Sequence, residues 1–290
     1  MFQTLAAALR RFLSGINLSS ILSLPLLNWG GGIRDAGNLD QRQLETVGIT
    51  GHRYPSATQD SPASLYEPQL FKEPAIIFIL GAPGTGKGTL STFLNSRFSR
   101  LTHLSYGDLI RRQDGISGSW VSSLPRRKGT NKPDITPSSA VWLIRAAIEA
   151  GNVRNGQWTW LIDGFPRKEH DVVEWVAQMP QACCVFYLSC PPEVSLARVL
   201  GRASTSGRPE DGDENVARER ITRAIAESEA MLVALEESGM KITRVDANRD
   251  PEIIREEIIE EIKKVLVSLK IKERVKEVMK KLVDERSVLK

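Results

Sequence analysis

Short, continuous apolar runs alternate along the chain with stretches in which apolar residues recur at helical spacing. Runs of this kind, ending at glycine or polar residues, are typical of strands buried on both faces of a sheet. They span residues 75–80, 101–105, 158–162, 183–189 and 242–245. The helical stretches span residues 89–98, 138–149, 169–178, 193–200 and 215–238. Strands that alternate with helices predict βαβ units, and therefore an α/β fold with a parallel sheet and helices on both faces.

The first 73 residues differ from the rest and are expected to form a poorly ordered N-terminal extension and linker. Residues 35–73 are polar and rich in Gly, Pro, Ser and Gln, as linkers are. Residues 1–34 contain arginines but no acidic residue, and their apolar residues fall near helical spacing, which is similar to an organellar presequence. These features also suit a disordered extension or a short surface helix, so we expect a cytoplasmic protein, with mitochondrial targeting through residues 1–34 as the alternative.

The end of the chain is predicted to be helical. From Pro251 onward Ile and Val recur at helical spacing and no further Gly or Pro interrupts them, which predicts one long helix or two short ones. We assign residues 74–268 to a compact domain and residues 269–290 to a basic helical tail. The tail is interpreted as a solvated helix, with a lipid or partner contact as the alternative.

The overall charge is close to balanced, with 39 basic and 35 acidic residues and a formal net charge of +4. So small an excess does not indicate nucleic-acid binding, although it suits an arginine-rich site for phosphate. No apolar stretch is long enough to predict a helix that crosses a bilayer. The three cysteines fit no metal-ligand spacing and are expected to be reduced thiols.

The strongest chemical signal is the glycine-rich segment Gly81-Ala82-Pro83-Gly84-Thr85-Gly86-Lys87-Gly88-Thr89, between the first strand and the first helix. In this context the glycines let backbone N–H groups turn inward and cradle phosphate oxygens. The positive end of the following helix adds to the attraction. Lys87 is placed to contact the β- and γ-phosphates. The sequence therefore predicts an ATP-binding loop formed by Gly81, Gly84, Thr85, Gly86, Lys87, Gly88 and Thr89.

Three further blocks follow this loop. They are His103–Arg111 (HLSYGDLIR), Asp163–Arg167 (DGFPR) and the arginines Arg198, Arg202, Arg208 and Arg220. Together with the loop, in which Gly88 stands between Lys87 and Thr89, they resemble the adenylate kinase and UMP-CMP kinase family of nucleoside monophosphate kinases. The resemblance implies a P-loop NTPase fold with a doubly wound parallel sheet of about five strands. It also implies a small helical insert for the monophosphate over about 108–150 and a short lid over about 202–214.

The resemblance further implies a reaction and the residues that perform it. ATP would phosphorylate a nucleoside monophosphate with the help of Mg²⁺, through positioning and charge stabilisation, and a monomer is the expected state. The residues implied to act in catalysis are Lys87, Arg167, Arg202, Arg208 and Arg220. Those implied to bind the monophosphate are Tyr106, Asp108, Arg111, Gly164, Arg167 and Asp171. Asp163 is expected to hold Mg²⁺ through water, with Asp108 sharing that task, and Arg198 to cover the ATP base or join the catalytic arginines.

Three positions depart from the family pattern in the site for the acceptor. One is Ser139, at a position that is often acidic in relatives. Tyr106 replaces a small residue, so its phenol would narrow the space for the base. Asp171 replaces an amide that reads the base, and a carboxylate only accepts hydrogen bonds. If Asp171 faces the base it needs a donor, which favours CMP over UMP, with AMP as the family-level alternative. Two alternatives stay open: the side chains of Tyr106 and Asp171 point elsewhere, or the chain is an ATP-binding regulatory protein whose acceptor site is altered or lost.

Overall fold

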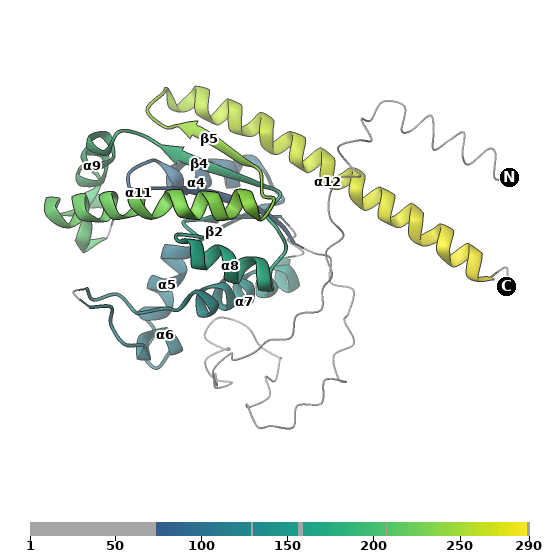
Figure 1. Cartoon of the computed structure of the whole chain (residues 1–290), viewed down its shortest axis with the longest axis horizontal. Coiled ribbons are helices and arrows are strands. Elements are labelled where there is room, and N and C mark those ends of the chain that lie inside the picture. The colour runs from purple at the N-terminus through teal and green to yellow at the C-terminus, as the bar shows by residue number, and fades with distance from the viewer. Residues whose placement is uncertain (1–73, 129, 156–158, 207, 289–290) are drawn as a thin grey trace. The chain divides into compact units, whose positions relative to one another are not determined.

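The computed structural model describes residues 74–128, 130–155, 159–206 and 208–288, which build a parallel sheet with helices packed on it (Figure 1). The strands are β1 (Ala75–Gly81), β2 (Leu101–Ser105), β3 (Thr159–Asp163), β4 (Cys184–Ser189) and β5 (Ile242–Asp246). The helices are α4 (Lys87–Arg97), α5 (Tyr106–Asp114), α6 (Trp120–Ser123), α7 (Pro137–Asn155), α8 (Glu169–Gln178), α9 (Pro192–Gly201), α10 (Ala203–Ser206), the 3-10 turn η1 (Pro209–Asp211), α11 (Glu214–Glu237) and α12 (Pro251–Val288). The predictions of a poorly ordered extension over residues 1–73 and of a targeting segment over residues 1–34 lie outside the described residues.

All neighbouring strands are parallel, in the order β2-β3-β1-β4-β5, so the predicted parallel α/β sheet of five strands is confirmed. β1 lies in the middle, between β3 and β4. Helix α4, which follows β1, packs on one face of the sheet, and α8, which follows β3, packs on the other. The helices that follow the adjacent strands β1 and β3 thus pack on opposite faces of the sheet. Parallel sheets bind ligands at the carboxyl ends of two such strands.

The predicted strands and helices match the structure closely, apart from the end of one helix. The pattern predicts a helix over residues 138–149, but α7 continues to Asn155. A Cβ atom at Gly151 would lie 2.4 Å from the indole of Trp160, and the Nε1 of this indole donates to Asn152 Oδ1 at 2.9 Å. Gly151 gives the indole room to pack against α7, so the helix passes through a residue that by itself predicts termination.

Strand β1 is buried on both faces, and its alternate residues enter two hydrophobic clusters. Ile76, Phe78 and Leu80 pack with residues of α5, α7, α8 and α11. Ile77 and Ile79 pack with residues of α4 and α12 on the other face. Because successive side chains of a strand point to opposite faces, a strand covered on both sides has a continuous apolar sequence.

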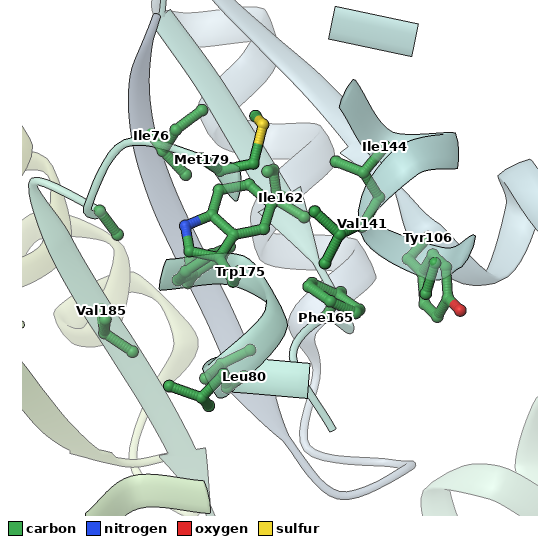
Figure 2. Packing of buried hydrophobic residues seen from close by; sticks show 14 of the residues in the cluster. Ile76, Leu80, Tyr106, Val141, Ile144, Ile162, Phe165, Trp175, Met179 and Val185 are labelled. Atoms are coloured by element: carbon green, nitrogen blue, oxygen red, sulfur yellow. The ribbon is translucent and has the colours of Figure 1, made fainter. Parts of the chain in front are cut away.

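Trp175 of α8 lies at the centre of the larger cluster (Figure 2). Its ring centroid lies 4.9 Å from that of Phe78 and 5.9 Å from that of Phe165. Phe165 in turn packs edge to face on Tyr106, with 5.1 Å between the ring centroids. Trp175 has an exposed fraction of 0%, and its Nε1 donates to the carbonyl of Pro180 at 2.9 Å. This series of aromatic rings connects the centre of the core to the first residue of α5.

The C-terminal part of the chain is one continuous helix, α12, which crosses the predicted boundary between domain and tail at residue 268. Its first half packs on the sheet through Ile254, Ile258 and Ile262. The domain boundary and the solvated character of the tail stay predictions. Among the helices that the structure describes, none combines the length and apolar character needed to span a membrane.

We expect Trp175→Ala to lower the free energy of unfolding by about 3–5 kcal/mol, because removing a fully buried indole leaves a cavity. Urea denaturation measures this free energy. Val173→Ala is the matched control on the same helix: Val173 has an exposed fraction of 60%, so the change should stay within about 0.5 kcal/mol. Equal effects of the two substitutions would contradict the central place of Trp175 in the core.

Candidate active site

The glycine-rich loop lies between β1 and α4, in the strand–loop–helix context that its sequence predicts. Two of its side chains turn back onto one carbonyl group. The Thr85 hydroxyl donates to Ala82 O at 2.9 Å, and Lys87 Nζ donates to the same oxygen at 2.8 Å. Gly86 caps α4 with a φ of 92°, a conformation that favours glycine. The first turn of α4 therefore starts directly at the loop, with Lys87 as its first residue.

Two other glycines let the loop approach its neighbours. A Cβ atom at Gly81 would lie 2.2 Å from the carbonyl oxygen of Leu188 in β4. A Cβ atom at Gly84 would lie 2.2 Å from the carbonyl oxygen of Ser195 in α9. Both glycines also have positive φ, so any other residue would be strained as well as too large. The loop is thus fitted between its own strand, β4 and α9.

The charge of Lys87 is held in an unfavourable environment. Burial lowers the pKa of the Lys87 ammonium group to about 8, an effect that Asp163 opposes. Arg167, Arg202 and Arg208 lower this pKa further through repulsion. Repulsion of this kind requires proximity, so the structure brings together cations that the sequence places far apart.

The carboxyl end of β3 places a buried carboxylate next to the loop. Asp163, the last residue of β3, has an exposed fraction of 9%. A Cβ atom at Gly88 would lie 3.9 Å from Asp163 Oδ2, so this carboxylate faces the first turn of α4. The same oxygen lies 3.6 Å from Nε2 of His103 in β2. This nitrogen is buried and has no hydrogen-bond partner among the described residues.

Arg167 is fixed in the turn that follows β3. Its Nε donates to the carbonyl of Gly164 at 2.8 Å, and its guanidinium carbon lies 4.8 Å from the centre of the Tyr106 ring. Tyr106 is buried, with an exposed fraction of 5%, and burial raises the pKa of its phenol to about 12. The structure thus places this aromatic ring beneath a guanidinium group, a favourable cation–π arrangement. Whether the phenol also narrows the space for a base stays a prediction.

Gly107, the second residue of α5, has two arginines beside it. A Cβ atom at this position would lie 3.3 Å from Arg111 Nη1 and 3.7 Å from Arg167 Nη2. The two guanidinium groups, one from α5 and one from the turn after β3, therefore converge on the same backbone position. Paired planar guanidinium groups are suited to gripping the oxygens of one phosphate.

Asp108 lies among these arginines. Its backbone N–H donates to the Ser105 hydroxyl, which caps α5, and its carboxylate accepts a hydrogen bond from Arg111 Nη2. Arg208 Nη2, from the segment between α10 and η1, lies 3.9 Å from the same carboxylate. Burial would raise the pKa of Asp108, but the hydrogen bonds and the charges of Arg111 and Arg208 bring it below its usual value. Asp108 thereby connects α5 to the predicted lid.

The short connection predicted as a lid is formed by α10 and η1, between α9 and α11. Arg202 follows α9, and Arg220 lies on α11. Both pair with Asp211 at the end of η1: Arg202 Nε lies 2.9 Å from Asp211 Oδ2, and Arg220 Nη1 lies 2.9 Å from Asp211 Oδ1. The Asp211 side chain has an exposed fraction of 0%.

Two of the predicted site residues, Asp171 and Arg198, form hydrogen bonds with backbone groups. Asp171, in the first turn of α8, accepts hydrogen bonds through Oδ2 from the backbone N–H groups of Arg167 (2.9 Å) and Lys168 (3.2 Å). This is a capping interaction that fixes the start of α8. Arg198 of α9 donates from Nη1 to the carbonyl of Ala247, after β5, at 3.0 Å. A contact of either residue with a base stays a prediction.

A family model and several known proteins are similar to this chain in sequence. A family model described as an AAA domain matches residues 80–217. The chain is 30% identical over 208 residues to uridylate kinase of Saccharomyces cerevisiae, an alignment that covers 72% of this chain and 98% of the yeast protein. It is 31% identical over 202 residues to UMP-CMP kinase of Danio rerio, covering 67% of this chain and 97% of that protein. UMP-CMP kinase 3 of Arabidopsis thaliana is also 31% identical over 192 residues, covering 64% of this chain and 88% of that protein.

The chain belongs to the family of nucleoside monophosphate kinases. The family resemblance derived from the sequence motifs is therefore confirmed, as is the assignment of the chain as a kinase. In a nucleoside monophosphate kinase, cations at the carboxyl ends of β1 and β3 are suited to phosphoryl transfer, which depends on positioning and charge neutralisation.

Three charged residues of this kinase were not identified from the sequence: Lys132, Glu210 and Asp211. Asp211 pairs with two of the predicted arginines, and Lys132 Nζ lies 2.9 Å from Glu210 Oε1. The available signal was the pair Glu210-Asp211 inside a segment flanked by arginines. Acidic residues among arginines predict ion pairs, but the sequence does not show which pairs are buried.

We expect Lys87→Met to raise the melting temperature of the ligand-free protein near pH 7. The folded pKa of Lys87 is about 8, below the unfolded value of about 10.4, so the folded state is penalised for holding the charge. The penalty is fully present at pH values below the pKa of Lys87 in the folded state. It decreases as the pH rises through that pKa, and it is absent above the pKa of the unfolded state. The gain in melting temperature should therefore shrink toward pH 10.

Differential scanning calorimetry at both pH values measures this effect. Lys128→Met is the control, because Lys128 is an exposed lysine on the loop before α7 and should shift the melting temperature little at either pH. A melting temperature of Lys87→Met equal to or below that of the wild type near pH 7 would contradict the penalty.

Proposed function

We propose that this kinase transfers the terminal phosphoryl group of ATP to a pyrimidine nucleoside monophosphate, with CMP ahead of UMP. The observation that carries the proposal is the convergence of cations: Arg111 and Arg167 meet beside Gly107, and the charges of Arg167, Arg202 and Arg208 add to burial in lowering the pKa of Lys87. Such a group of cations is complementary to two phosphate-bearing substrates brought end to end. The names of the relatives, uridylate kinase and UMP-CMP kinase, support a pyrimidine acceptor.

Each part of the site has its own task in this proposal. The loop over residues 81–89 and the start of α4 hold the phosphates of ATP, with Lys87 next to the transferring group. Arg111 and Arg167 grip the phosphate of the acceptor beside Gly107, where a side chain would fill the space. Arg202, Arg208 and Arg220 stabilise the charge that develops on the transferring phosphoryl group, and Arg198 lies nearer to the base of ATP.

Magnesium is the cofactor that this chemistry requires. Asp163 fits it, because its buried carboxylate faces the first turn of α4 and Mg²⁺ is usually bound by one or two carboxylates, several waters and the substrate phosphates. Among the described residues, no group of three or more His, Cys, Asp and Glu is arranged to hold a metal ion. Asp108 is the second carboxylate assigned to it. Held there, Mg²⁺ would supply positive charge that neutralises part of the charge of the phosphates.

The preference for CMP rests on Asp171. One carboxylate oxygen of Asp171 caps α8, and the carboxylate can accept further hydrogen bonds but donate none. Cytosine offers an amino group to such an acceptor, whereas the O4 of uracil is itself an acceptor. If Asp171 faces the base, it therefore favours CMP.

The alternative, an ATP-binding regulatory protein with a lost acceptor site, is less well supported. The residues assigned to the acceptor phosphate, Arg111 and Arg167, converge on Gly107 as an intact site would need. The departures at Tyr106 and Asp171 are accommodated within the fold: Tyr106 lies beneath Arg167, and Asp171 caps α8. Nothing in these contacts blocks an acceptor.

A coupled assay with ATP, Mg²⁺ and each of CMP, UMP, AMP and GMP tests the proposed function. We expect the order CMP, UMP, AMP in kcat/KM, and a loss of kcat of about 10²–10³-fold or more in Lys87→Met, because a preorganised cation is removed. Turnover with none of the four monophosphates would refute the proposed activity. AMP as the best acceptor would refute the pyrimidine preference.

Asp171→Asn tests the basis of that preference. The amide oxygen can still cap α8, while the amide nitrogen adds a donor that suits uracil O4. We expect the ratio of kcat/KM for UMP to that for CMP to rise about tenfold. This is the change expected when one hydrogen bond to the base is gained with UMP or lost with CMP. Glu169→Gln, which removes an exposed carboxylate from the same turn, is the control and should leave the ratio unchanged. An unchanged ratio in Asp171→Asn would show that Asp171 does not read the base.

A further inference from the structure

Helix α12 continues past the sheet with apolar residues that the core does not cover. Among its described side chains, the last that pack on the core are Val265 and Leu266. Val267 has an exposed fraction of 56%, and Val275 has an exposed fraction of 41%. Ile271, between them, is half-buried. Because Val267, Ile271 and Val275 are spaced four residues apart, they lie on one face of the helix.

The sequence continues this row of apolar residues. Val278 and Leu282 follow Val275 at spacings of three and four residues, so helical spacing assigns their positions to the same face. We call the row formed by Val267, Ile271, Val275, Val278 and Leu282 the apolar stripe. It extends over about four turns of the helix. Contiguous apolar surface that is exposed in this way marks a site of contact with a protein or a membrane.

The charge of α12 changes sign where the helix leaves the sheet. Residues 251–264, at the end that packs on the sheet, include three basic and five acidic residues. A lysine of this part is paired: Lys263 Nζ lies 2.6 Å from Glu260 Oε1. Residues 269–290, the tail, include eight basic and four acidic residues, a net charge of +4 that equals the charge of the whole chain. The tail therefore favours a partner with a negative surface.

The charged positions of residues 267–282 are distributed unevenly around the helix. At 3.6 residues per turn, the charged positions that border the apolar stripe are basic on both sides. These border cations are Lys272 on one side and Lys270, Arg274 and Lys281 on the other. Both acidic positions, Glu273 and Glu277, lie on the side of the helix away from the stripe. Long basic side chains next to an apolar surface extend their charged ends to its edge, where they meet phosphate groups in a bilayer.

The same distribution argues against a second copy of this chain as the partner. Two helices that pair through an apolar stripe bring the positions beside the stripe together, and opposite charges there stabilise the pair. In two copies of α12 the border cations would face other cations, in either direction of pairing. A bilayer with anionic lipids suits the arrangement, because the acyl chains accept the stripe and the headgroups attract the cations.

We propose that the second half of α12, from Val267 onward, binds in the plane of a bilayer surface that contains anionic lipids. The apolar stripe enters the boundary between headgroups and acyl chains, and the border cations contact lipid phosphates. This proposal adopts the lipid contact in place of a tail that is only solvated. It goes beyond the proposed function, because no residue assigned to the reaction lies on α12.

Cosedimentation of the full chain with vesicles tests the apolar stripe. We expect binding to vesicles of phosphatidylcholine with phosphatidylserine, weaker binding to phosphatidylcholine alone, and a decrease with salt. Val267→Glu should lower the partition coefficient at least about tenfold, because it replaces a buried apolar contact by a charge. Val173→Glu is the matched control: it changes a valine of α8 with an exposed fraction of 60% and should bind as the wild type does.

Residues 1–34 are also basic, so the comparison between variants decides the role of α12. Equal partition coefficients of Val267→Glu and the wild type would overturn the proposal, as would a wild type that binds neither kind of vesicle. Equal binding of the wild type to both kinds of vesicle would overturn the requirement for anionic lipid.

The double variant Lys270→Gln with Lys272→Gln tests the border cations separately. Each cation near an anionic surface contributes about a factor of five to binding, so we expect a loss of about 25-fold. Lys128→Gln, which removes an exposed cation from the loop before α7, is the control and should change the partition coefficient little. A loss in the double variant no larger than in the control would overturn the role of the border cations.

Sedimentation equilibrium without vesicles distinguishes the bilayer from a second copy. We expect the wild type and Val267→Glu to have the same molar mass. A wild-type dimer that Val267→Glu dissociates would show that the stripe is covered by a second copy, and would overturn the proposal. Vesicle binding does not require phosphoryl transfer, so a failure here is distinguishable from a failure of the proposed function.

Discussion

The burial of a lysine among other cations is the constraint on which the arrangement of this kinase depends. Lys87 and the arginines Arg167, Arg202 and Arg208 lie close enough to change the pKa of Lys87, although three different segments carry them. Like charges at such distances raise the free energy of the folded chain. The sheet resists their separation, because Lys87 follows the loop after β1 and Arg167 lies in the turn after β3, and these two adjacent strands contain fully buried apolar residues. The core thus holds in place a group of charges that would otherwise move apart.

Three carboxylates, which are buried to different extents, offset part of this repulsion. Asp211 is completely buried between two arginines, Asp163 is nearly buried beside Lys87, and Asp108 is more than half exposed, with 56% of its side-chain surface accessible. The buried pairs fix geometry, whereas an exposed carboxylate is screened by water and can exchange partners. An excess of positive charge therefore remains at the carboxyl ends of β1 and β3. A site that is unfavourable for the ligand-free fold and complementary to phosphates is preorganised for their transfer.

The departures from the family pattern illustrate how one residue can serve both fold and site. Tyr106 continues the aromatic series from Trp175 through Phe165, and its ring supports Arg167. Asp171 stabilises the start of α8 by accepting from the backbone of the segment that carries Arg167. Both residues therefore help to fix Arg167, the residue to which the proposed function assigns the acceptor phosphate.

The sequence by itself determined the parallel sheet, the phosphate-binding loop and the family, because these depend on local patterns. A strand buried on both faces must be continuously apolar, as in residues 75–80, and a loop that cradles phosphate needs glycines at fixed spacing before a helix. Only the tertiary structure decided that α7 continues past Gly151, because the contact between Gly151 and Trp160 joins residues of different elements. It also decided which charges are paired: Asp211 with Arg202 and Arg220, and Lys132, in the loop before α7, with Glu210 of η1. Ion pairs of this kind depend on distances between segments and on burial, and a linear pattern of charges specifies neither.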